Sequence, residues 1–102
     1  MDKHYKTPHG DFEWEADKAD RNRRKHGVTF EQAAEAFADP YALVSYDAAH
    51  SETEDRFRLL GMSGTSLVYF VIFVERGAIR IISARKANRM EVRHYDSNRQ
   101  KY

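Results

Sequence analysis

The chain has 102 residues, a formal net charge of +1 and no cysteine. This length suits one domain with a single modest core, and the lack of cysteine excludes a disulfide framework and a thiol nucleophile. An apolar fraction of 41% indicates a folded chain, not a disordered one. The longest apolar run, Leu67 to Val74, is far shorter than the roughly 20 residues of a membrane span, and no hydrophobic signal region follows Met1. We therefore expect a soluble cytoplasmic protein without a membrane segment.

Charges are segregated along the chain although they nearly cancel in total. One basic cluster occupies residues 21–25 and a second runs from residue 80 to residue 101, while acidic side chains gather between residues 31 and 55. Two basic segments can offer a polyanion a local positive surface. Charge alone is equally compatible with side chains that only solvate helices.

The first ten residues differ in character from the remainder. They are polar, contain Pro8 and Gly10, and show no hydrophobic period, so we expect a flexible arm or a leader foreign to the domain. A single domain should then span residues 11–102. At its start Phe12 and Trp14 alternate with charged residues, which predicts a short edge strand.

Two helices are predicted next. The first runs from Ala16 to His26 and stops at Gly27, because glycine favours the left-handed conformation of a C-cap. The second begins at Thr29, which can form a capping box with Gln32, and ends at the Asp-Pro pair of residues 39–40. Apolar side chains at positions 30, 33, 34 and 37 give this second helix one apolar face.

Four strands and a last helix complete the predicted order. The strands cover residues 42–46, 56–62, 67–74 and 78–84, and the helix covers about residues 86–96. The strand of residues 67–74 lacks a polar face, which is typical of a central strand. Arg76 and Gly77 indicate a tight turn, so the last two strands should form an antiparallel hairpin. The predicted fold class is α+β: a small, mostly antiparallel sheet with two N-terminal helices on one face and a C-terminal helix.

Two arginines interrupt the last apolar strand. Arg80 lies between two isoleucines that should face the core, and Arg85 follows where the strand ends. A guanidinium in an apolar strand needs a partner, because burying an isolated charge costs more than the strand recovers. Phosphate is a natural partner, since the arginine fork matches its oxygens two at a time. For Arg85, a salt bridge to Glu91 that anchors the last helix is an equal alternative.

Several short segments form an ordered set at consistent spacings. They are Phe12-Glu13-Trp14, Lys25 to Ala33, Phe37-Ala38-Asp39-Pro40, His50 to Arg56, Gly61-Met62-Ser63, Glu75-Arg76-Gly77 and Ile79 to Ala87. Together they resemble the BrnT family of bacterial toxins over about residues 11–95. The chain departs from that family at Glu15-Ala16, where an Asp-Pro pair usually opens the first helix.

The resemblance implies a fold, an activity and partners. Membership would imply a RelE-like fold and a metal-independent endoribonuclease that inhibits translation by cleaving RNA, with no cofactor. It would also imply a cognate antitoxin whose DNA-binding part is of the ribbon-helix-helix type. Operator DNA would then be bound only through the antitoxin, and a homodimer within the complex is compatible with this arrangement.

Metal-free RNA cleavage requires a base for the 2′-hydroxyl, positive charge at the phosphate and an acid for the leaving 5′-oxygen. Glu54, Arg56 and Arg58 should share one strand face if the strand is regular that far back, so Glu54 can act as base and Arg56 as phosphate ligand. The alternative is a surface ion pair. The candidate catalytic residues are Glu54, Arg56, Arg80, Arg85 and His26.

A second set of residues is predicted to bind RNA. Lys18, Asn22, Lys25 and His26 share one helical face, which suits a stripe that follows phosphates. For His26 the alternative is a cation that complements a helix C-terminus, and for His50 it is a residue of a polar turn. The candidate RNA-binding residues are Lys18, Lys25, His50, Arg58 and Lys86.

Other functions remain open at the level of sequence. The five histidines show no zinc spacing, and no HExxH, EF-hand or P-loop pattern occurs, so we expect no metal site. Besides a toxin ribonuclease, the chain is compatible with a non-catalytic RNA-binding or co-repressor module, such as a decayed toxin. A purely structural interaction partner is a third alternative.

Overall fold

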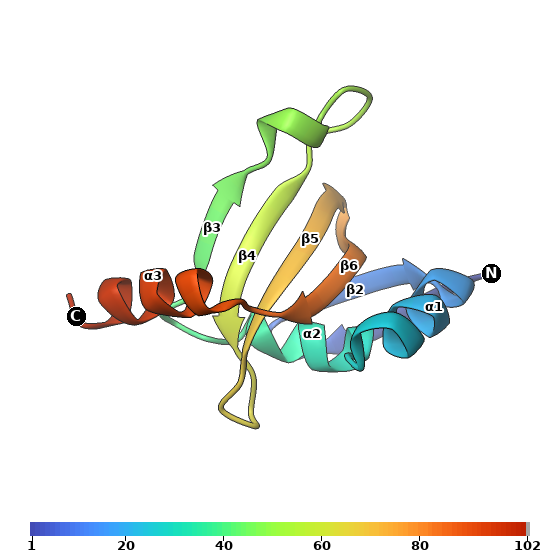
Figure 1. The fold of residues 1–102 in the computed structure, drawn as a ribbon. Helices are drawn as coiled ribbons and strands as arrows, with labels where there is room; N and C mark the ends of the chain where they lie inside the picture. Colours follow the sequence, from blue (N-terminus) through green and yellow to red (C-terminus); the bar gives the residue numbers. More distant parts are fainter. Residues whose placement is uncertain (102) are drawn as a thin grey trace.

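A computed structural model describes residues 1–101, which form one mixed six-stranded sheet and three α-helices (Figure 1). The strand order is β1-β2-β6-β5-β4-β3, and every neighbouring pair is antiparallel except the parallel pair of β2 and β6. This confirms the predicted α+β class. The elements are β1 (Asp2–Thr7), β2 (Gly10–Glu15), α1 (Ala16–His26), α2 (Phe30–Ala36), β3 (Leu43–Tyr46), the 3₁₀ helix η1 (Ala48–His50), β4 (Phe57–Met62), β5 (Val68–Arg76), β6 (Ala78–Lys86) and α3 (Arg89–Arg99).

Strand β1 lies in the segment for which the sequence predicted a flexible arm. It pairs with β2 along its whole length, from Asp2 opposite Glu15 to Thr7 opposite Gly10. The strand is polar because it forms an edge of the sheet, so its residues carry no apolar alternation that could reveal it. The predicted edge strand, β2, is therefore an internal strand, and its Phe12 is only 1% exposed.

Local capping signals predicted the bounds of α1 and the start of α2 correctly, whereas α2 ends at Ala36, before the predicted stop at Asp39-Pro40. The side chain of Glu15 accepts hydrogen bonds from two backbone N–H groups of the first turn of α1, so a glutamate replaces the usual N-cap residue. Gly27 ends α1 with φ of 71°, in the left-handed region. At α2 the Thr29–Gln32 capping box has both of its hydrogen bonds, at 2.8 and 3.1 Å.

The last helix starts three residues later than the sequence predicted. Strand β6 continues to Lys86, which pairs with Tyr69, so the segment assigned to the helix start is extended. Asn88 then acts as N-cap and forms a capping box with Glu91, with two hydrogen bonds of 2.8 Å. The boundary was wrong because the strand pairing outweighs the helix propensity of residues 86–88.

Helices cover the two faces of the sheet to different extents (Figure 1). Helix α2 packs behind the sheet, on the face that carries Leu59, Val71 and Ile81, which we call the back face. Helix α3 crosses the opposite, front face, where Tyr95 packs with Leu60. It covers only one half of the front face, and the half next to η1 stays open.

Helix α2 approaches strand β4 closely at Gly61. A Cβ atom at this glycine would lie 2.5 Å from the carbonyl oxygen of Ala36 and 2.8 Å from a methyl carbon of Leu59. Both contacts are shorter than van der Waals packing permits, so this position requires glycine. At Gly64, in the β4–β5 turn, the nearest atom to such a Cβ would be a Glu35 carboxylate oxygen at 3.8 Å.

Gly61→Ala should therefore lower the free energy of unfolding by about 1–3 kcal/mol, because the added methyl overpacks the α2–β4 contact. Gly64→Ala serves as the matched control and should leave it unchanged, or raise it by up to about 1 kcal/mol through the unfolded state. Urea unfolding followed by circular dichroism measures both values. Equal stability of the two variants would contradict the packing described for Gly61.

The carboxylate of Asp39 fastens α3 to the sheet. Its Oδ2 accepts hydrogen bonds from the Tyr95 hydroxyl and from the backbone N–H of Met62, the latter at 2.8 Å, and its Oδ1 accepts from the N–H of Tyr41 at 2.9 Å. Burial would raise the pKa of Asp39, but these hydrogen bonds outweigh it and hold the pKa below its ordinary value. Burial and the contact with Asp39 raise the pKa of Tyr95 to about 12.

Asp39→Asn should lower the free energy of unfolding at pH 7 by about 1–3 kcal/mol, because a charged acceptor with three donors is lost. The pKa of Asp39 is lower in the folded than in the unfolded chain, so its contribution is complete above about pH 4 and is lost as the pH falls through the folded value. The stability difference between the wild-type chain and the variant should therefore shrink from pH 7 to pH 3 in urea titrations. Asp11→Asn, at an exposed position, is the control. A difference that stays constant with pH would contradict this role of Asp39.

Candidate active site

The open half of the front face contains a cavity of about 320 Å³, which we call the central cavity. Its floor is apolar and comes from strands β5 and β6, while η1 and the start of β4 supply polar and basic side chains on one wall. The lining residues are Asp47, His50, Arg56, Arg58, Phe70, Ile72, Ile82 and Ser83. An apolar floor with convergent charged groups is typical of a ligand site.

Asp47 and His50 form a carboxylate–imidazole pair at this wall. The Nδ1 atom of His50 lies 3.0 and 3.2 Å from the two carboxylate oxygens of Asp47. The Asp47 side chain is 8% exposed and that of His50 is 71% exposed, so a buried acid orients an accessible ring. A carboxylate at Nδ1 favours the tautomer with its proton on that nitrogen, which leaves Nε2 free to accept a proton. The sequence suggested only a turn residue or an RNA contact for His50.

Arg58 has a buried donor that finds no acceptor within residues 1–101. Its Nη2 donates to the carbonyl of Tyr46 at 3.3 Å, but its Nε is buried and, within residues 1–101, has no hydrogen-bond partner. Buried donors are nearly always satisfied by protein groups or by ordered water, so this guanidinium N–H is available to an acceptor from outside the chain, which makes the cavity a candidate ligand site. The geometry of this group suits an anion with several oxygens, such as phosphate.

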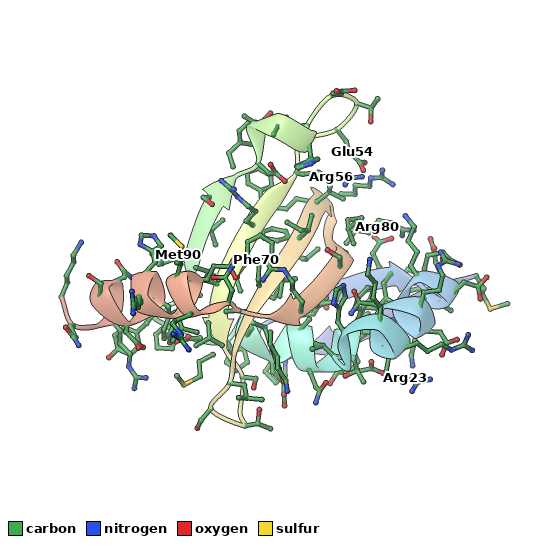
Figure 2. The ribbon with its side chains drawn as sticks, viewed as in Figure 1. Arg23, Glu54, Arg56, Phe70, Arg80 and Met90 are labelled. Carbon is green, nitrogen blue, oxygen red and sulfur yellow. The ribbon has the colours of Figure 1, made fainter. Side chains whose placement is uncertain are left out.

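Glu54 and Arg56 lie together at the entrance to β4 (Figure 2). Glu54 accepts a hydrogen bond from Arg76 and lies 4.0 Å from Nη2 of Arg56. The Arg76 hydrogen bond lowers the pKa of Glu54, against a smaller effect of burial, and the charges of Arg56 and Lys18 lower it further. Glu54 is thus ionised and a weaker base than a free carboxylate. This arrangement suits the holding of Arg56 better than the uptake of a proton.

A second cavity, of about 350 Å³, lies beside the central cavity against α1, and we call it the α1 cavity. The two share Ile82 and Ser83. The α1 cavity contains all four residues of the helical stripe that the sequence assigned to phosphates, together with Arg21, which was not among the predicted site residues. Its full lining is Lys18, Arg21, Asn22, Lys25, His26, Ile82 and Ser83.

Asn22 sets the position of α1 at this cavity. Its amide nitrogen donates to the carbonyl oxygens of Ala84 and Val28, at 2.7 and 3.0 Å, and its amide oxygen accepts from the N–H of Ala84 at 3.1 Å. The side chain is buried, with 7% exposure. The sequence placed Asn22 on the RNA-binding face of the helix, but the structure makes it the anchor of that helix.

Arg80 has carboxylate partners where the sequence suggested a phosphate. Its Nη1 donates to Glu13 at 2.7 Å, and both Nη atoms donate to Asp2 at 3.0 and 3.1 Å. The hydrogen bond to Asp2 raises the pKa of Arg80, burial opposes this, and Glu13 raises it further. The guanidinium therefore joins β6 to β1 and β2, and Arg80 is not among the residues that line either cavity. The sequence could not show this partner because Asp2 lies 78 positions away.

Arg85 and Lys86 also lie outside the two cavities. Arg85 donates two hydrogen bonds to Glu91, at 2.7 and 2.9 Å, which raise its pKa, and its guanidinium carbon lies 4.2 Å from the ring centroid of Phe70. The salt bridge that anchors the last helix, one of the two predicted alternatives, is therefore present. Lys86 is exposed at the end of β6.

Two charged lining residues were missed in the sequence, and both carried a usable signal. Asp47 lies three positions before His50, a spacing that brings side chains together in a 3₁₀ turn. Arg21 lies three positions after Lys18 and four before Lys25, on the same helical face. Among residues 1–101 no three His, Cys, Asp or Glu side chains are grouped so that they could hold a metal ion. No helix in the same range has the length and apolar character needed to cross a membrane.

Comparison with known proteins decides the family. The family model described as the ribonuclease toxin BrnT of type II toxin–antitoxin systems matches residues 14–91. The chain belongs to the BrnT family. The crystal structure of the Brucella abortus ribonuclease toxin BrnT is similar to it, with a TM-score of 0.59 and 26% identity, over 74% of this chain and 94% of that one. No curated protein sequence gave a significant match.

The BrnT match contains every residue that lines the two cavities. It also contains Arg85 and Glu91, whereas Asp2 and Glu13, the partners of Arg80, precede it. The family resemblance read from the sequence is therefore confirmed. The cavity residues lie in the part of the chain that is common to BrnT toxins.

Substitution by methionine should change the free energy of unfolding differently at Arg58 and at Arg80. Arg80→Met should lower the free energy of unfolding by about 1–3 kcal/mol, because Glu13 and Asp2 lose their partner. Arg58→Met should leave it unchanged or raise it, because an unsatisfied buried donor is removed. Chemical unfolding of both variants measures the difference. A larger loss for Arg58→Met than for Arg80→Met would show that Arg58 is structural.

Proposed function

We propose that this BrnT-family chain is a metal-independent endoribonuclease that inhibits translation by cleaving RNA. The observation that carries the proposal is the unpaired Nε of Arg58 in the same cavity as the Asp47–His50 pair. The Arg58 guanidinium lacks an anionic acceptor, and the His50 ring has a nitrogen, Nε2, that can accept a proton. A phosphodiester with a neighbouring hydroxyl supplies what both groups lack.

The proposed reaction is an internal transfer of the phosphoryl group. Nε2 of His50 takes the proton of the 2′-hydroxyl, the 2′-oxygen forms a bond to phosphorus, and the bond from phosphorus to the 5′-oxygen breaks. His26, in its protonated form, gives a proton to the departing 5′-oxygen. Arg56 and Arg58 stabilise the charge that develops on the phosphoryl oxygens. The products are a 2′,3′-cyclic phosphate and a 5′-hydroxyl end.

The other predicted catalytic residues take supporting roles in this proposal. Glu54 positions Arg56, since its low pKa makes it a poor proton acceptor and a good partner for a cation. Arg80 and Arg85 hold β1 and α3 in place through their carboxylate partners. These assignments give the site Arg56, held by Glu54, and Arg58, whose Nε has no partner within residues 1–101, together with one base and one acid and without a metal ion.

The proposed partners follow from the family. A type II system pairs a toxin with a protein antitoxin, so a cognate antitoxin of ribbon-helix-helix type would neutralise this chain in the cytoplasm. Operator DNA would be bound only through that antitoxin. The family description supports the existence of an antitoxin. The ribbon-helix-helix fold of that antitoxin, its contact with DNA, a homodimer within the complex and a RelE-like fold of this chain remain predictions.

The purified chain should cleave RNA in EDTA and leave 2′,3′-cyclic phosphate ends. His50→Gln should lower the cleavage rate by about 10²- to 10⁴-fold, the usual contribution of general base catalysis, and Asp47→Asn should lower it less. Arg24→Gln is the control, because Arg24 pairs with Asp20 on another face of α1. Cleavage is measured by gel electrophoresis and end-group analysis. Intact RNA with the wild-type chain, both with and without ribosomes, would refute the proposal.

A non-catalytic RNA-binding or co-repressor module is the second candidate. It is favoured by the pairing of Arg80 and Arg85 with carboxylates, which leaves fewer free cations for a phosphoryl group than the sequence suggested. This function predicts RNA binding that weakens with salt and no cleavage under any of the conditions above.

A further inference from the structure

We propose that the α1 cavity is a second phosphate subsite, which holds the phosphate on the 3′ side of the scissile one. The substrate would then be single-stranded RNA that spans both cavities. This inference rests on the proposed ribonuclease function, because it takes the central cavity as the site of cleavage. It adds a binding site whose effect on substrate choice can be measured separately.

The first argument is the charge of the α1 cavity. Its lining contains four basic residues and no carboxylate. Within residues 1–101 none of the four forms a salt bridge, whereas Arg23 and Arg24 on the same helix are both bound to Asp20, at 3.0 and 2.7 Å. In Figure 2 Arg23 lies on the side of α1 away from Arg56 and Glu54. The four basic residues are Lys18, Arg21, Lys25 and His26.

The helix therefore has two different basic faces. On one face the Asp20 carboxylate pairs with both arginines, and on the other, among the described residues, the cations beside Ile82 and Ser83 form no salt bridge. Unpaired cations that converge on a cavity favour an anion from outside the chain. Lysine and arginine contacts of this kind bind phosphates and carry no information about base sequence.

The second argument is continuity with the central cavity. Ile82 and Ser83 line both cavities, so an RNA strand that leaves one cavity passes over these two residues into the other. The charge of Lys18 also makes a small contribution to the lowered pKa of Glu54, at the entrance to β4. Groups of α1 and groups around the central cavity thus face one ligand path.

The third argument is the rigidity of α1. Asn22 fixes the middle of the helix to β6 with hydrogen bonds in both directions to Ala84, and Gly27 ends the helix next to His26. The basic side chains therefore extend from a backbone that is already in place. A preorganised site binds without the cost of ordering a loop.

The direction of the RNA follows from the acid in the proposed reaction. If His26 protonates the departing 5′-oxygen, the nucleotide on the 3′ side of the cut lies at α1. The next phosphate along the strand then belongs to Lys18, Arg21 and Lys25. A single strand is required because in-line attack by the 2′-oxygen needs a backbone that the A-form helix does not adopt, and proteins reach unstacked bases mainly in single strands.

Two matched dinucleotides test this inference in the intact protein. Both contain the same single phosphodiester, and one carries an additional phosphate at its 3′ end while the other carries it at its 5′ end. The 3′-phosphate should lower KM by about tenfold relative to the plain dinucleotide, the effect expected of one charge-assisted contact set. The 5′-phosphate should change KM by less than about twofold.

Variants of α1 assign the effect to the cavity. Lys25→Gln and Arg21→Gln should each bring the KM ratio of the two phosphorylated dinucleotides towards one, and Arg24→Gln, on the carboxylate-bound face, should leave it unchanged. Urea unfolding confirms that each variant is folded. If the dinucleotides are cleaved but the two phosphates have equal effects, or Arg24→Gln acts like Lys25→Gln, the α1 subsite is refuted and the ribonuclease proposal stands.

Binding of an uncleavable 2′-O-methyl oligonucleotide separates the remaining outcomes. The slope of the logarithm of the binding constant against the logarithm of the salt concentration should become shallower by about 0.7 in Lys25→Gln, because one phosphate contact is lost. The slope should not change in Arg24→Gln. This result without cleavage of any RNA would refute the ribonuclease proposal and retain the α1 phosphate site. An unchanged salt dependence in Lys25→Gln would refute the site.

Discussion

Strand β6 pairs with β2 over only two residues, and beyond them the amide of Asn22 takes the place of a neighbouring strand. It exchanges two hydrogen bonds with the backbone of Ala84, which satisfies a buried edge that would otherwise cost free energy. Because Asn22 belongs to α1, the same bonds fix this helix beside Ile82 and Ser83. The basic face of α1 and the cavity on the sheet therefore share one floor. A structural requirement of the sheet thus brings two charged regions, distant in sequence, to one site.

The arginines of this chain differ in whether the chain supplies their partners. Arg80 and Arg85 have carboxylate partners at hydrogen-bond distance, so each can be explained as a link between elements of the fold. The Nε of Arg58 is a buried donor without a partner in the described part of the chain, which is a cost that the fold does not recover. Groups that lower stability without a structural return are expected where a ligand binds. The presence or absence of a carboxylate partner, and not the number of arginines, therefore indicates which part of the front face is the candidate ligand site.

The position of α3 keeps the candidate site open. The Tyr95 hydroxyl binds Asp39 and the Glu91 carboxylate binds Arg85, so the helix is held over one half of the front face. The other half is bordered by η1, whose His50 is oriented by the buried carboxylate of Asp47. The bonds of Glu91 and Tyr95 stabilise the fold in one half of this sheet face, and the Asp47 carboxylate orients the His50 ring in the other half.

The sequence by itself determined what depends on neighbouring residues: the bounds of α1, the capping box of α2, the β5–β6 hairpin and the ordered segments that mark a BrnT toxin. It also predicted correctly that the residues beside Arg80 face the core, since strand side chains alternate. Only the tertiary structure decided that residues 2–7 form a strand and that Asp2 binds Arg80. It also decided that Asn22 anchors α1 and that Asp47 holds His50 at a cavity. Helix caps and turns are set by contacts over a few residues, whereas the partner of a charged side chain depends on strand register between distant segments, which no local pattern encodes.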